Sequence, residues 1–308
     1  FETGKEYIPD SLVKLPRGSQ RDRFRFTRLY LPGNTPSMMI NAGLHKPSGV
    51  ILDLEDAVAP EAKAGARQAV LEAVARGYGN REVLIRINSL ESPWGQDDLA
   101  MVVAAKPHGL LLPKVTSGEQ LGQVDAALNQ AGADPDMGVW AMIEMPQAVL
   151  RLDEIAAAAE GTRLCGLVMG LNDLAVETGA LVTPDRAAFQ TALSMAVMAA
   201  RAWGLVVIDG VFNDFRDEAG LLRECEQGRM LGFDGKSLIN PAQIEVANRT
   251  FAPDPEDLVH ARAIIEAFAQ AENQGKGVIQ VAGKMVELLH LQLAQRLVAI
   301  SEAISASA

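Results

Sequence analysis

GVWAMIEMPQAVLRLDEIAAAAEGTRLCGLVMGLNDLA (residues 138–175) contains two apolar runs with a helical stretch between them. The first run ends at Glu144, and Asp173 follows closely after the second. Continuous apolar runs of this length are typical of strands that are buried on both faces of a parallel sheet. Two such strands, one helix apart, bring both carboxylates to the same end of the sheet, where α/β enzymes place their chemistry.

The same unit of an apolar run, a turn residue and an amphipathic helical stretch recurs along the chain. The eight candidate strands are RLYLPG (28–33), GVILDLED (49–56), EVLIRIN (82–88), HGLLLPK (108–114), GVWAMIE (138–144), LCGLVMG (164–170), GLVVIDGVF (204–212) and LGFDGKS (231–237). Eight such units predict an α/β fold, a (β/α)8 TIM barrel. A doubly wound open sheet is the alternative, although no G-x-G-x-x-G turn follows the first strand.

After the eighth unit the pattern changes, and no further βα unit follows. The tail contains a helical stretch, a Gly-rich break, a strand-like VIQVAG segment and a long helical pattern that starts at Met285. We therefore predict a barrel with an N-terminal arm over residues 1–249. Residues 250–308 are predicted to form a C-terminal helical extension that serves as a lid or an oligomer contact.

Composition excludes several classes of function. The 308 residues carry a net charge of −11, which argues against a nucleic-acid partner because phosphate binding requires a concentrated basic surface. Cys165 and Cys225 are not spaced as a zinc site or a disulfide framework, so we expect a reducing, cytoplasmic location. No apolar run approaches the ~20 residues that cross a bilayer, so we expect no membrane partner.

Residues at the carboxyl ends of barrel strands point into the mouth of the barrel. This rule collects Asp53, Glu55, Asp56, Arg86, Asn88, Lys114, Glu144, Asn172, Asp173 and Asp209. Crowded carboxylates repel one another unless a cation neutralises them. Mg2+ suits such a mouth because it accepts one or two carboxylates and takes its other oxygens from water and substrate. We take Glu144 and Asp173 as its ligands, with helix capping as the alternative role of both acids.

Two basic residues of the mouth have alternative roles. Arg86 lies inside an apolar strand, where it is costly unless it is paired or binds an anion. It is either a clamp for a substrate carboxylate or thioester oxygen, or a structural ion pair with Glu55 or Asp56. Lys114 is a candidate for the Schiff-base lysine of a Class I aldolase, which would require a desolvated amine with a lowered pKa.

The segments LYLPGNTPSMM, GVILDLEDAVAPEAKAGAR, VLIRIN, GLLLPKV, AMIEMP, GLVMGLNDLA, IDGVFNDF and GFDGKSLINPAQI cover nearly the whole chain. In this order, the chain resembles the citrate lyase beta-subunit-like family of CoA-ester lyases, which is related to the metal-dependent HpcH/HpaI aldolases. The resemblance implies a (β/α)8 barrel whose C-terminal extension closes a neighbour's active site in a homo-oligomer, a trimer or a hexamer.

The resemblance also implies roles for the acidic residues and the arginine of the mouth. Glu144 and Asp173 would hold Mg2+, with Mn2+ as a second metal that the same site accepts. Arg86 would contact the substrate carboxylate or the thioester carbonyl. Glu55 and Asp56 would form the acidic support beside them.

Further residues are implied as contacts of the substrate. The segment Gly170, Leu171 and Asn172 would hold the carboxylate of the ketoacid. Arg25 and Arg28, which flank Phe26-Thr27 where the family has Arg-Ser, would contact the phosphates of coenzyme A.

The tail departs from the family pattern. In the family a G-x-M-I-D-x-P segment carries an aspartate that acts as a catalytic acid, whereas this chain has GKMVELLH. Glu287 occupies the place of the aspartate, and the proline is missing. A further departure is Asn240, which stands where a histidine is common.

The resemblance implies a Mg2+-dependent carbon–carbon lyase. It would cleave a thioester such as malyl-CoA or citramalyl-CoA by retro-Claisen chemistry to acetyl-CoA and glyoxylate or pyruvate, with Glu287 of a neighbouring subunit protonating the product. Three alternatives use the same site. They are a citrate lyase beta subunit acting on a carrier-bound citryl thioester, a malyl-CoA thioesterase, and an aldolase for free hydroxy-ketoacids.

Overall fold

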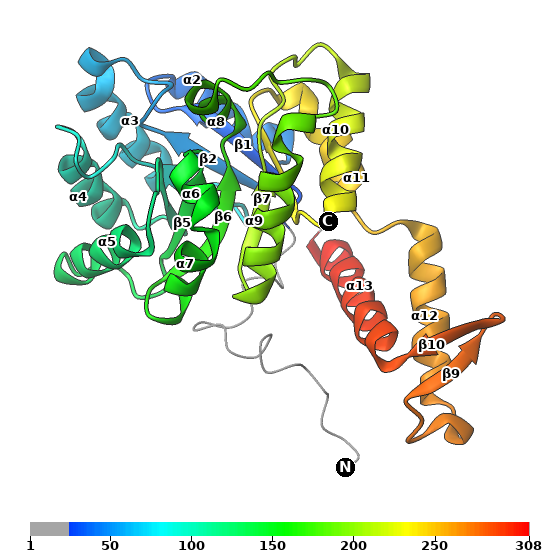
Figure 1. Cartoon of the computed structure of the whole chain (residues 1–308). Coiled ribbons are helices and arrows are strands. Elements are labelled where there is room, and N and C mark those ends of the chain that lie inside the picture. The colour runs from blue at the N-terminus through cyan, green and yellow to red at the C-terminus, as the bar shows by residue number, and fades with distance from the viewer. Residues whose placement is uncertain (1–24, 308) are drawn as a thin grey trace. The chain divides into compact units, whose positions relative to one another are not determined.

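The computed structural model describes residues 25–307, so the predicted N-terminal arm lies outside the described residues. The described chain forms two compact units, which divide between Phe251 and Ala252. The first unit carries the repeated strands and helices, and the second carries the tail (Figure 1). The role of the tail as a lid or an oligomer contact stays a prediction.

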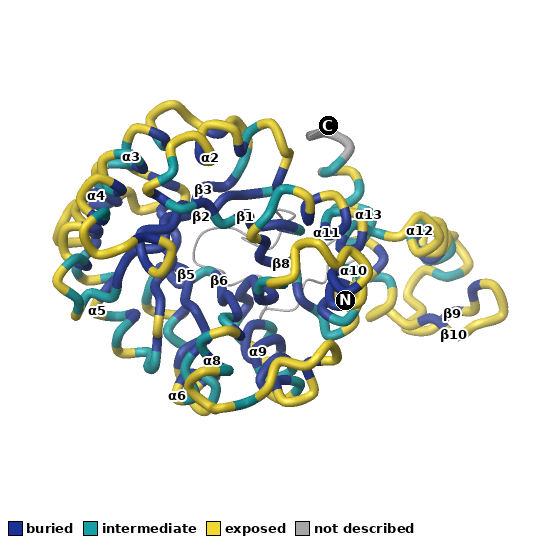
Figure 2. Tube along the Cα trace, turned by 90° about the horizontal axis from the view of Figure 1, so that it is seen from above, coloured by how far each residue is buried: buried dark blue, intermediate teal, exposed yellow. Residues whose placement is uncertain are grey.

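The first unit is a closed barrel of eight parallel strands, in which each strand pairs with its neighbours in the sequence and β1 pairs with β8 (Figures 1 and 2). The strands are β1 (Thr27–Pro32), β2 (Gly49–Asp53), β3 (Glu82–Arg86), β4 (Gly109–Leu112), β5 (Gly138–Ile143), β6 (Leu164–Met169), β7 (Val206–Asp209) and β8 (Gly235–Leu238). The predicted TIM barrel is therefore confirmed. The eighth strand starts later than expected because residues 231–234 complete the preceding helix and its left-handed Gly232 cap.

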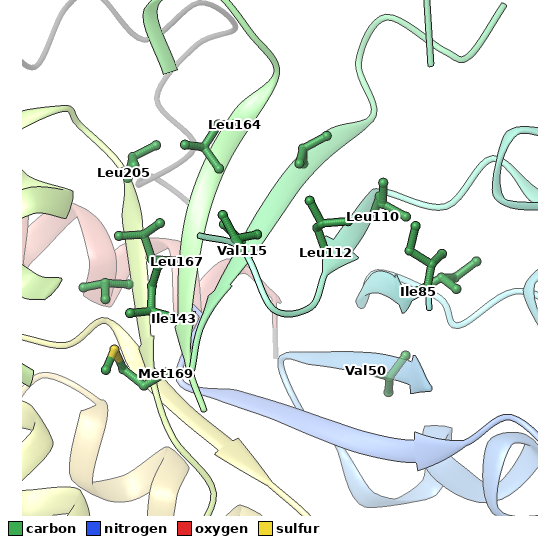
Figure 3. Close-up of a cluster of buried hydrophobic side chains, with 14 of the residues drawn as sticks. Val50, Ile85, Leu110, Leu112, Val115, Ile143, Leu164, Leu167, Met169 and Leu205 are labelled. Atoms are coloured by element: carbon green, nitrogen blue, oxygen red, sulfur yellow. The ribbon is translucent and has the colours of Figure 1, made fainter. Parts of the chain in front are cut away.

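Side chains alternate between two apolar layers along the strands. One layer fills the inside of the barrel and contains Ile51, Leu84, Leu111, Trp140, Met142, Val168, Val206 and Ile208. The other layer packs between the strands and the surrounding helices, and Figure 3 shows part of it, including Val50, Ile85 and Leu110. Both faces of the strands are thus buried, which explains why they read as continuous apolar runs.

The helices of the barrel unit cover the outside of the strands (Figure 2). They are α2 (Pro36–Asn41), α3 (Lys63–Arg76), α4 (Gly95–Ala105), α5 (Gly118–Gln130), α6 (Pro146–Leu150), α7 (Leu152–Ala157), α8 (Leu171–Thr178), α9 (Gln190–Ala202), α10 (Glu218–Leu231) and α11 (Ile244–Phe251). Short 3₁₀ turns precede several of them, as at Pro60–Ala62 and Ala187–Phe189. Within residues 25–307, no helix combines the length and the apolar character that crossing a membrane requires.

The amino-terminal end of the barrel is closed by charged side chains. Arg25 and Arg28 are both buried and both ion-pair with Glu82, and their guanidinium groups lie 5.5 and 5.3 Å from the ring of Trp140. The register aligns Arg28 with Gly49 and Gly49 with Glu82. Because Gly49 has no side chain, Arg28 occupies that space and reaches Glu82.

This arrangement contradicts the assignment of Arg25 and Arg28 to the phosphates of coenzyme A. Both arginines lie at the end of the barrel opposite to the mouth, and neither exposes more than 2% of its surface. Ligands of TIM barrels bind at the carboxyl ends of the strands. The two arginines therefore stabilise the floor of the barrel.

The second unit consists of α12 (Pro255–Ala269), a hairpin of β9 (Val278–Val281) and β10 (Lys284–Glu287), and α13 (Leu288–Ser307). The sequence pattern extended the last helix back to Met285, and this was wrong. Ala282 and Gly283 both have positive φ angles, as a tight hairpin turn requires, and the following residues pair with β9. The hairpin and both helices share a small apolar core around Ile264, Ile279 and Val286.

The tight interior leads to a prediction on stability. A Cβ at Gly166 would lie 2.4 Å from the indole of Trp140, so Gly166→Ala should lower the free energy of unfolding by ~1–3 kcal/mol or more. A Cβ at Gly122, in the interior of α5, meets nothing within 4 Å. Gly122→Ala should therefore raise stability by up to ~1 kcal/mol. Urea denaturation midpoints test the pair, and equal effects of the two substitutions would contradict this packing.

Candidate active site

Arg86 and Asp53 form an ion pair across the mouth of the barrel. They end β3 and β2, and the register places them side by side. Arg86 donates from Nε to Asp53 Oδ1 over 2.7 Å and from Nη2 to Asp53 Oδ2 over 2.6 Å. Its remaining nitrogen, Nη1, lies 3.1 Å from a carboxylate oxygen of Glu55. Burial would lower the pKa of Arg86, but the charge and hydrogen bonds of Asp53 outweigh it, so the pKa is raised.

Asp53 also organises the acidic loop that follows β2. Its carboxylate accepts hydrogen bonds from the backbone N–H groups of Glu55 (2.9 Å) and Ala57 (3.2 Å). Lys63 also stabilises this loop, because its ammonium donates to the carbonyl oxygens of Leu54 and Glu55. The predicted Glu55 is consequently buried, whereas the predicted Asp56 is exposed at the rim.

Lys114 connects the acidic loop to β4. Its Nζ donates to Glu55 Oε1 over 2.9 Å and lies 3.8 Å from Asp56 Oδ1. The hydrogen bond to Glu55 raises the pKa of Lys114. A Schiff-base lysine requires the opposite shift, so the pairing of Lys114 with Glu55 does not favour the Class I aldolase interpretation. Burial raises the pKa of Glu55, although the charge of Arg86 and the hydrogen bond from Lys114 oppose this shift.

Glu144 is fully buried directly after β5. Its Oε1 accepts a hydrogen bond from the backbone N–H of Lys114 over 2.7 Å, whereas its Oε2 has no hydrogen-bond partner among the residues that the structure describes. Burial, with a contribution from the charge of Asp173, raises the pKa of Glu144 to about 8. A buried carboxylate oxygen without a partner is costly, and it marks a place where a cation is expected.

Asp173 lies in the first turn of α8, the helix that follows β6. It is half-buried, and its charge acts on Glu144 and on Lys114. Helix capping does not account for either predicted ligand. Met145 is the N-cap of α6 and Gly170 is the N-cap of α8, and neither helix has a side-chain cap hydrogen bond.

The donor set at this mouth fits Mg2+. Nowhere in residues 25–307 do three His, Cys, Asp or Glu side chains gather as a complete metal site. The mouth instead offers two hard carboxylates, Glu144 with its unpartnered Oε2 and Asp173, whose charge acts on Glu144. Mg2+ commonly binds through one or two carboxylates and completes its shell with water and substrate oxygens. The buried oxygen of Glu144 is the observation that supports this fit.

The segment predicted to hold the ketoacid carboxylate offers fewer free backbone N–H groups than expected. The N–H of Gly170 donates to the carbonyl of Ile143 over 3.0 Å, so it does not point to a ligand. Leu171 and Asn172 begin α8, where the first backbone N–H groups have no acceptor within the helix. The side chain of Asn172 pairs reciprocally with that of Asn213, which follows β7.

Asp209 is not part of the mouth, contrary to its place at the end of a strand. Its neighbour Ile208 points into the barrel, so Asp209 points outward. It is fully buried against Arg186, at 2.7 Å, and Lys236, at 3.1 Å, with Glu224 completing the cluster. This buried ion cluster joins the strands to the outer layer and has no role in the candidate site.

Glu287 ends β10 in the second unit, and its side chain is exposed. Its backbone N–H donates to Nδ1 of His290 over 3.0 Å, which fixes the start of α13. Its role as an acid for a neighbouring subunit stays a prediction.

Sequence reasoning missed two neighbours of Arg86. The ring of Tyr30 lies 5.1 Å from the guanidinium carbon, and the sulfur of Met142 lies 3.6 Å from Nη1. Both residues belong to apolar runs that gave no sign of contact with a charged group. Tyr30 and Met142 contact Arg86 because all three side chains point to the inside of the barrel.

Comparison with known proteins agrees with this geometry. The profile of the HpcH/HpaI aldolase/citrate lyase family matches residues 27–241. The chain belongs to this family. A (3S)-malyl-CoA thioesterase from Cereibacter sphaeroides is 44% identical over 279 residues, which are 90% of this chain and 95% of the relative. A citrate lyase subunit beta from Leuconostoc mesenteroides is 34% identical over 288 residues, which are 92% of this chain and 95% of the relative.

A solved structure is also similar. It is the protein CitE from Mycobacterium tuberculosis in complex with magnesium, acetoacetate and coenzyme A. It superimposes with a TM-score of 0.74 at 26% sequence identity, and the match covers 91% of this chain and 99% of that chain.

The raised pKa of Glu144 predicts a pH dependence in the metal-free protein. The folded state favours the protonated carboxyl, so the contribution of Glu144 to stability is full below its ordinary pKa and is lost as the pH rises through about 8. The neutral Glu144→Gln variant should therefore gain stability relative to wild type between pH 5 and pH 9, on the order of a few kcal/mol.

Urea unfolding with a chelator present measures this difference, with Glu177→Gln, an exposed site on α8, as the control. Added Mg2+ should stabilise wild type at pH 8 and leave Glu144→Gln unchanged. Parallel pH curves for wild type and Glu144→Gln would contradict the assignment.

Proposed function

We propose that this protein is a Mg2+-dependent carbon–carbon lyase for 3-hydroxyacyl-CoA thioesters of the malyl-CoA or citramalyl-CoA type. The observation that carries the proposal is the unpartnered Oε2 of the buried Glu144, beside Asp173 and the Asp53–Arg86 pair. Glu144 and Asp173 would hold Mg2+, or Mn2+ in its place. The magnesium and coenzyme A in the CitE complex support both ligands for this chain.

The proposed reaction is a retro-Claisen cleavage. When bound, Mg2+ supplies a Lewis acid that lowers the pKa of the substrate hydroxyl. Glu55, whose pKa is raised by burial, accepts the hydroxyl proton, and the bond between the carbinol carbon and the carbon next to the thioester breaks. The products of this step are a ketoacid and a thioester enolate, and the positive charge of Arg86 stabilises the enolate oxygen. A proton from Glu287 then converts the enolate to acetyl-CoA.

Hydrolysis of the thioester is the second candidate, because the (3S)-malyl-CoA thioesterase is 44% identical. In that reaction water adds to the thioester carbonyl, and the products are malate and free coenzyme A. The same cation and the same arginine would stabilise the tetrahedral oxyanion. The replacement of the family's aspartate by Glu287 concerns carbon protonation, a step that hydrolysis does not need.

Glu287 acts in this scheme from a neighbouring subunit, so we propose a homo-oligomer, a trimer or a hexamer, in the cytoplasm. The spacing of Cys165 and Cys225, which indicates neither a zinc site nor a disulfide framework, supports a reducing compartment. Sedimentation of the full chain measures the oligomer. A citrate lyase beta subunit would differ in its substrate, because it would require a carrier-bound citryl thioester.

The test is turnover of malyl-, citramalyl- and citryl-CoA by the full chain with Mg2+. We expect acetyl-CoA and a ketoacid in equal amounts, and a loss of at least about 100-fold in kcat/KM for Asp173→Asn, since a metal ligand is removed. Glu177→Gln, on the same helix, should retain wild-type activity.

The products separate the alternatives. Free thiol and malate without acetyl-CoA would establish hydrolysis in place of cleavage. Turnover of carrier-bound citryl thioester alone would establish the citrate lyase subunit. Full activity of Asp173→Asn, or full activity after complete chelation, would contradict the metal site.

A further inference from the structure

Lys114 is the cation of the described mouth that remains accessible. Arg86 exposes 9% of its side chain, and all three of its nitrogens already meet partners on Asp53, Glu55 or Met142. Lys114 exposes 42% of its side chain. An anionic substrate that enters the mouth therefore meets the ammonium of Lys114 before it meets the buried guanidinium of Arg86.

The backbone of Lys114 is held in an unusual conformation. Its φ angle is 51°, in the left-handed region that glycine adopts without steric cost. Lys46 and Lys106 share this conformation, but each of them ends a helix, where it is common. Lys114 instead follows β4 by two residues, and its backbone N–H reaches Glu144 over 2.7 Å. Glycine would adopt this backbone conformation at a lower steric cost than lysine. The presence of lysine here therefore indicates a role for its side chain.

The ammonium of Lys114 has capacity for a further acceptor. It carries three hydrogens. Within residues 25–307 it makes one hydrogen bond, to Glu55 at 2.9 Å, and one longer contact, to Asp56 at 3.8 Å. Glu55 fixes the direction of the side chain, and 42% of that side chain is exposed.

We infer that Lys114 is a substrate-contacting residue, whose ammonium binds the free carboxylate of the malyl-type substrate at the rim of the mouth. This inference rests on the proposed function, because it assumes a substrate with a carboxylate near the metal. It assigns different roles to the two cations, Lys114 and Arg86. Lys114 binds the carboxylate of the ground state, and Arg86, held by Asp53, stabilises the charge that develops on the thioester oxygen.

A counter-ion role predicts a different result. If Lys114 only balanced the acidic side chains, its removal would leave binding of the substrate carboxylate unchanged. As a substrate contact, its removal should weaken binding of the anion. Mg2+ affinity should stay the same or increase, because a positive charge near the metal is lost.

The decisive variant is Lys114→Gly, which keeps the backbone N–H to Glu144 and suits the φ of 51°. The matched control is Lys106→Gly, which removes a lysine from another left-handed position, at the amino-terminal side of β4. Lys114→Gly should fold with wild-type or higher thermal stability. Its KM for the thioester should rise about 10- to 100-fold with kcat changed much less, as expected for a lost charge-assisted hydrogen bond. Lys106→Gly should change neither constant.

Binding of pyruvate to the Mg2+-loaded protein, followed by calorimetry, tests the inference without turnover. We expect pyruvate affinity to fall about 10-fold or more in Lys114→Gly and in the second variant, Lys114→Met, while Mg2+ affinity does not fall. Unchanged pyruvate affinity in Lys114→Gly, or an equal loss of Mg2+ and pyruvate affinity, would overturn the inference. If wild type turns over none of the three thioesters, the proposed function fails, and the pyruvate titration still decides the role of Lys114.

Discussion

The bidentate ion pair between Asp53 and Arg86 is the interaction on which the mouth of the barrel depends. It joins the ends of β2 and β3, and the same carboxylate accepts two backbone N–H groups of the loop that carries Glu55 and Asp56. One buried acid therefore fixes both the arginine and the acidic loop. Because a buried charge is stable only when it is paired and hydrogen-bonded, neither residue can be changed without freeing the other.

The carboxylates of Glu144 and Asp173 are not balanced in this way. Glu144 is buried with one oxygen unpartnered, and Asp173 adds a second negative charge nearby. Among the described residues, the backbone N–H of Lys114 is the hydrogen-bond donor to Glu144, and no side chain donates to it. This shortage of positive charge and of donors around two carboxylates is the physical reason to expect a divalent cation. The Asp53–Arg86 pair and Lys114 are the other charged groups of the mouth, and Lys114 reaches Glu144 through its backbone N–H.

The barrel could be predicted because its strands are buried on both faces and appear as apolar runs between turn residues. The strand-end rule collected Glu144, Asp173, Arg86 and Glu55, and the structure brings Arg86 and Glu55 into direct contact. Sequence could not decide the facing of a single terminal residue. Asp53 and Asp209 both end apolar strands, yet one points into the barrel and the other into an outer ion cluster.

The errors at the two ends of the chain have related causes. Arg25 and Arg28 precede or begin a strand, and only the register with Gly49 and Glu82 reveals that they close the floor. In the tail, the apolar spacing of MVELL fits a helix as well as a strand, and the positive φ angles at Ala282 and Gly283 decide for the hairpin.

The central claim, a metal held by Glu144 and Asp173, is tested most directly by anomalous diffraction from crystals soaked in Mn2+. The account predicts a single strong peak within coordination distance of Glu144 Oε2 and a carboxylate oxygen of Asp173. Two results would contradict it: no peak at the mouth in crystals in which Mn2+ fully occupies another site, or a peak at the mouth that contacts neither Glu144 nor Asp173.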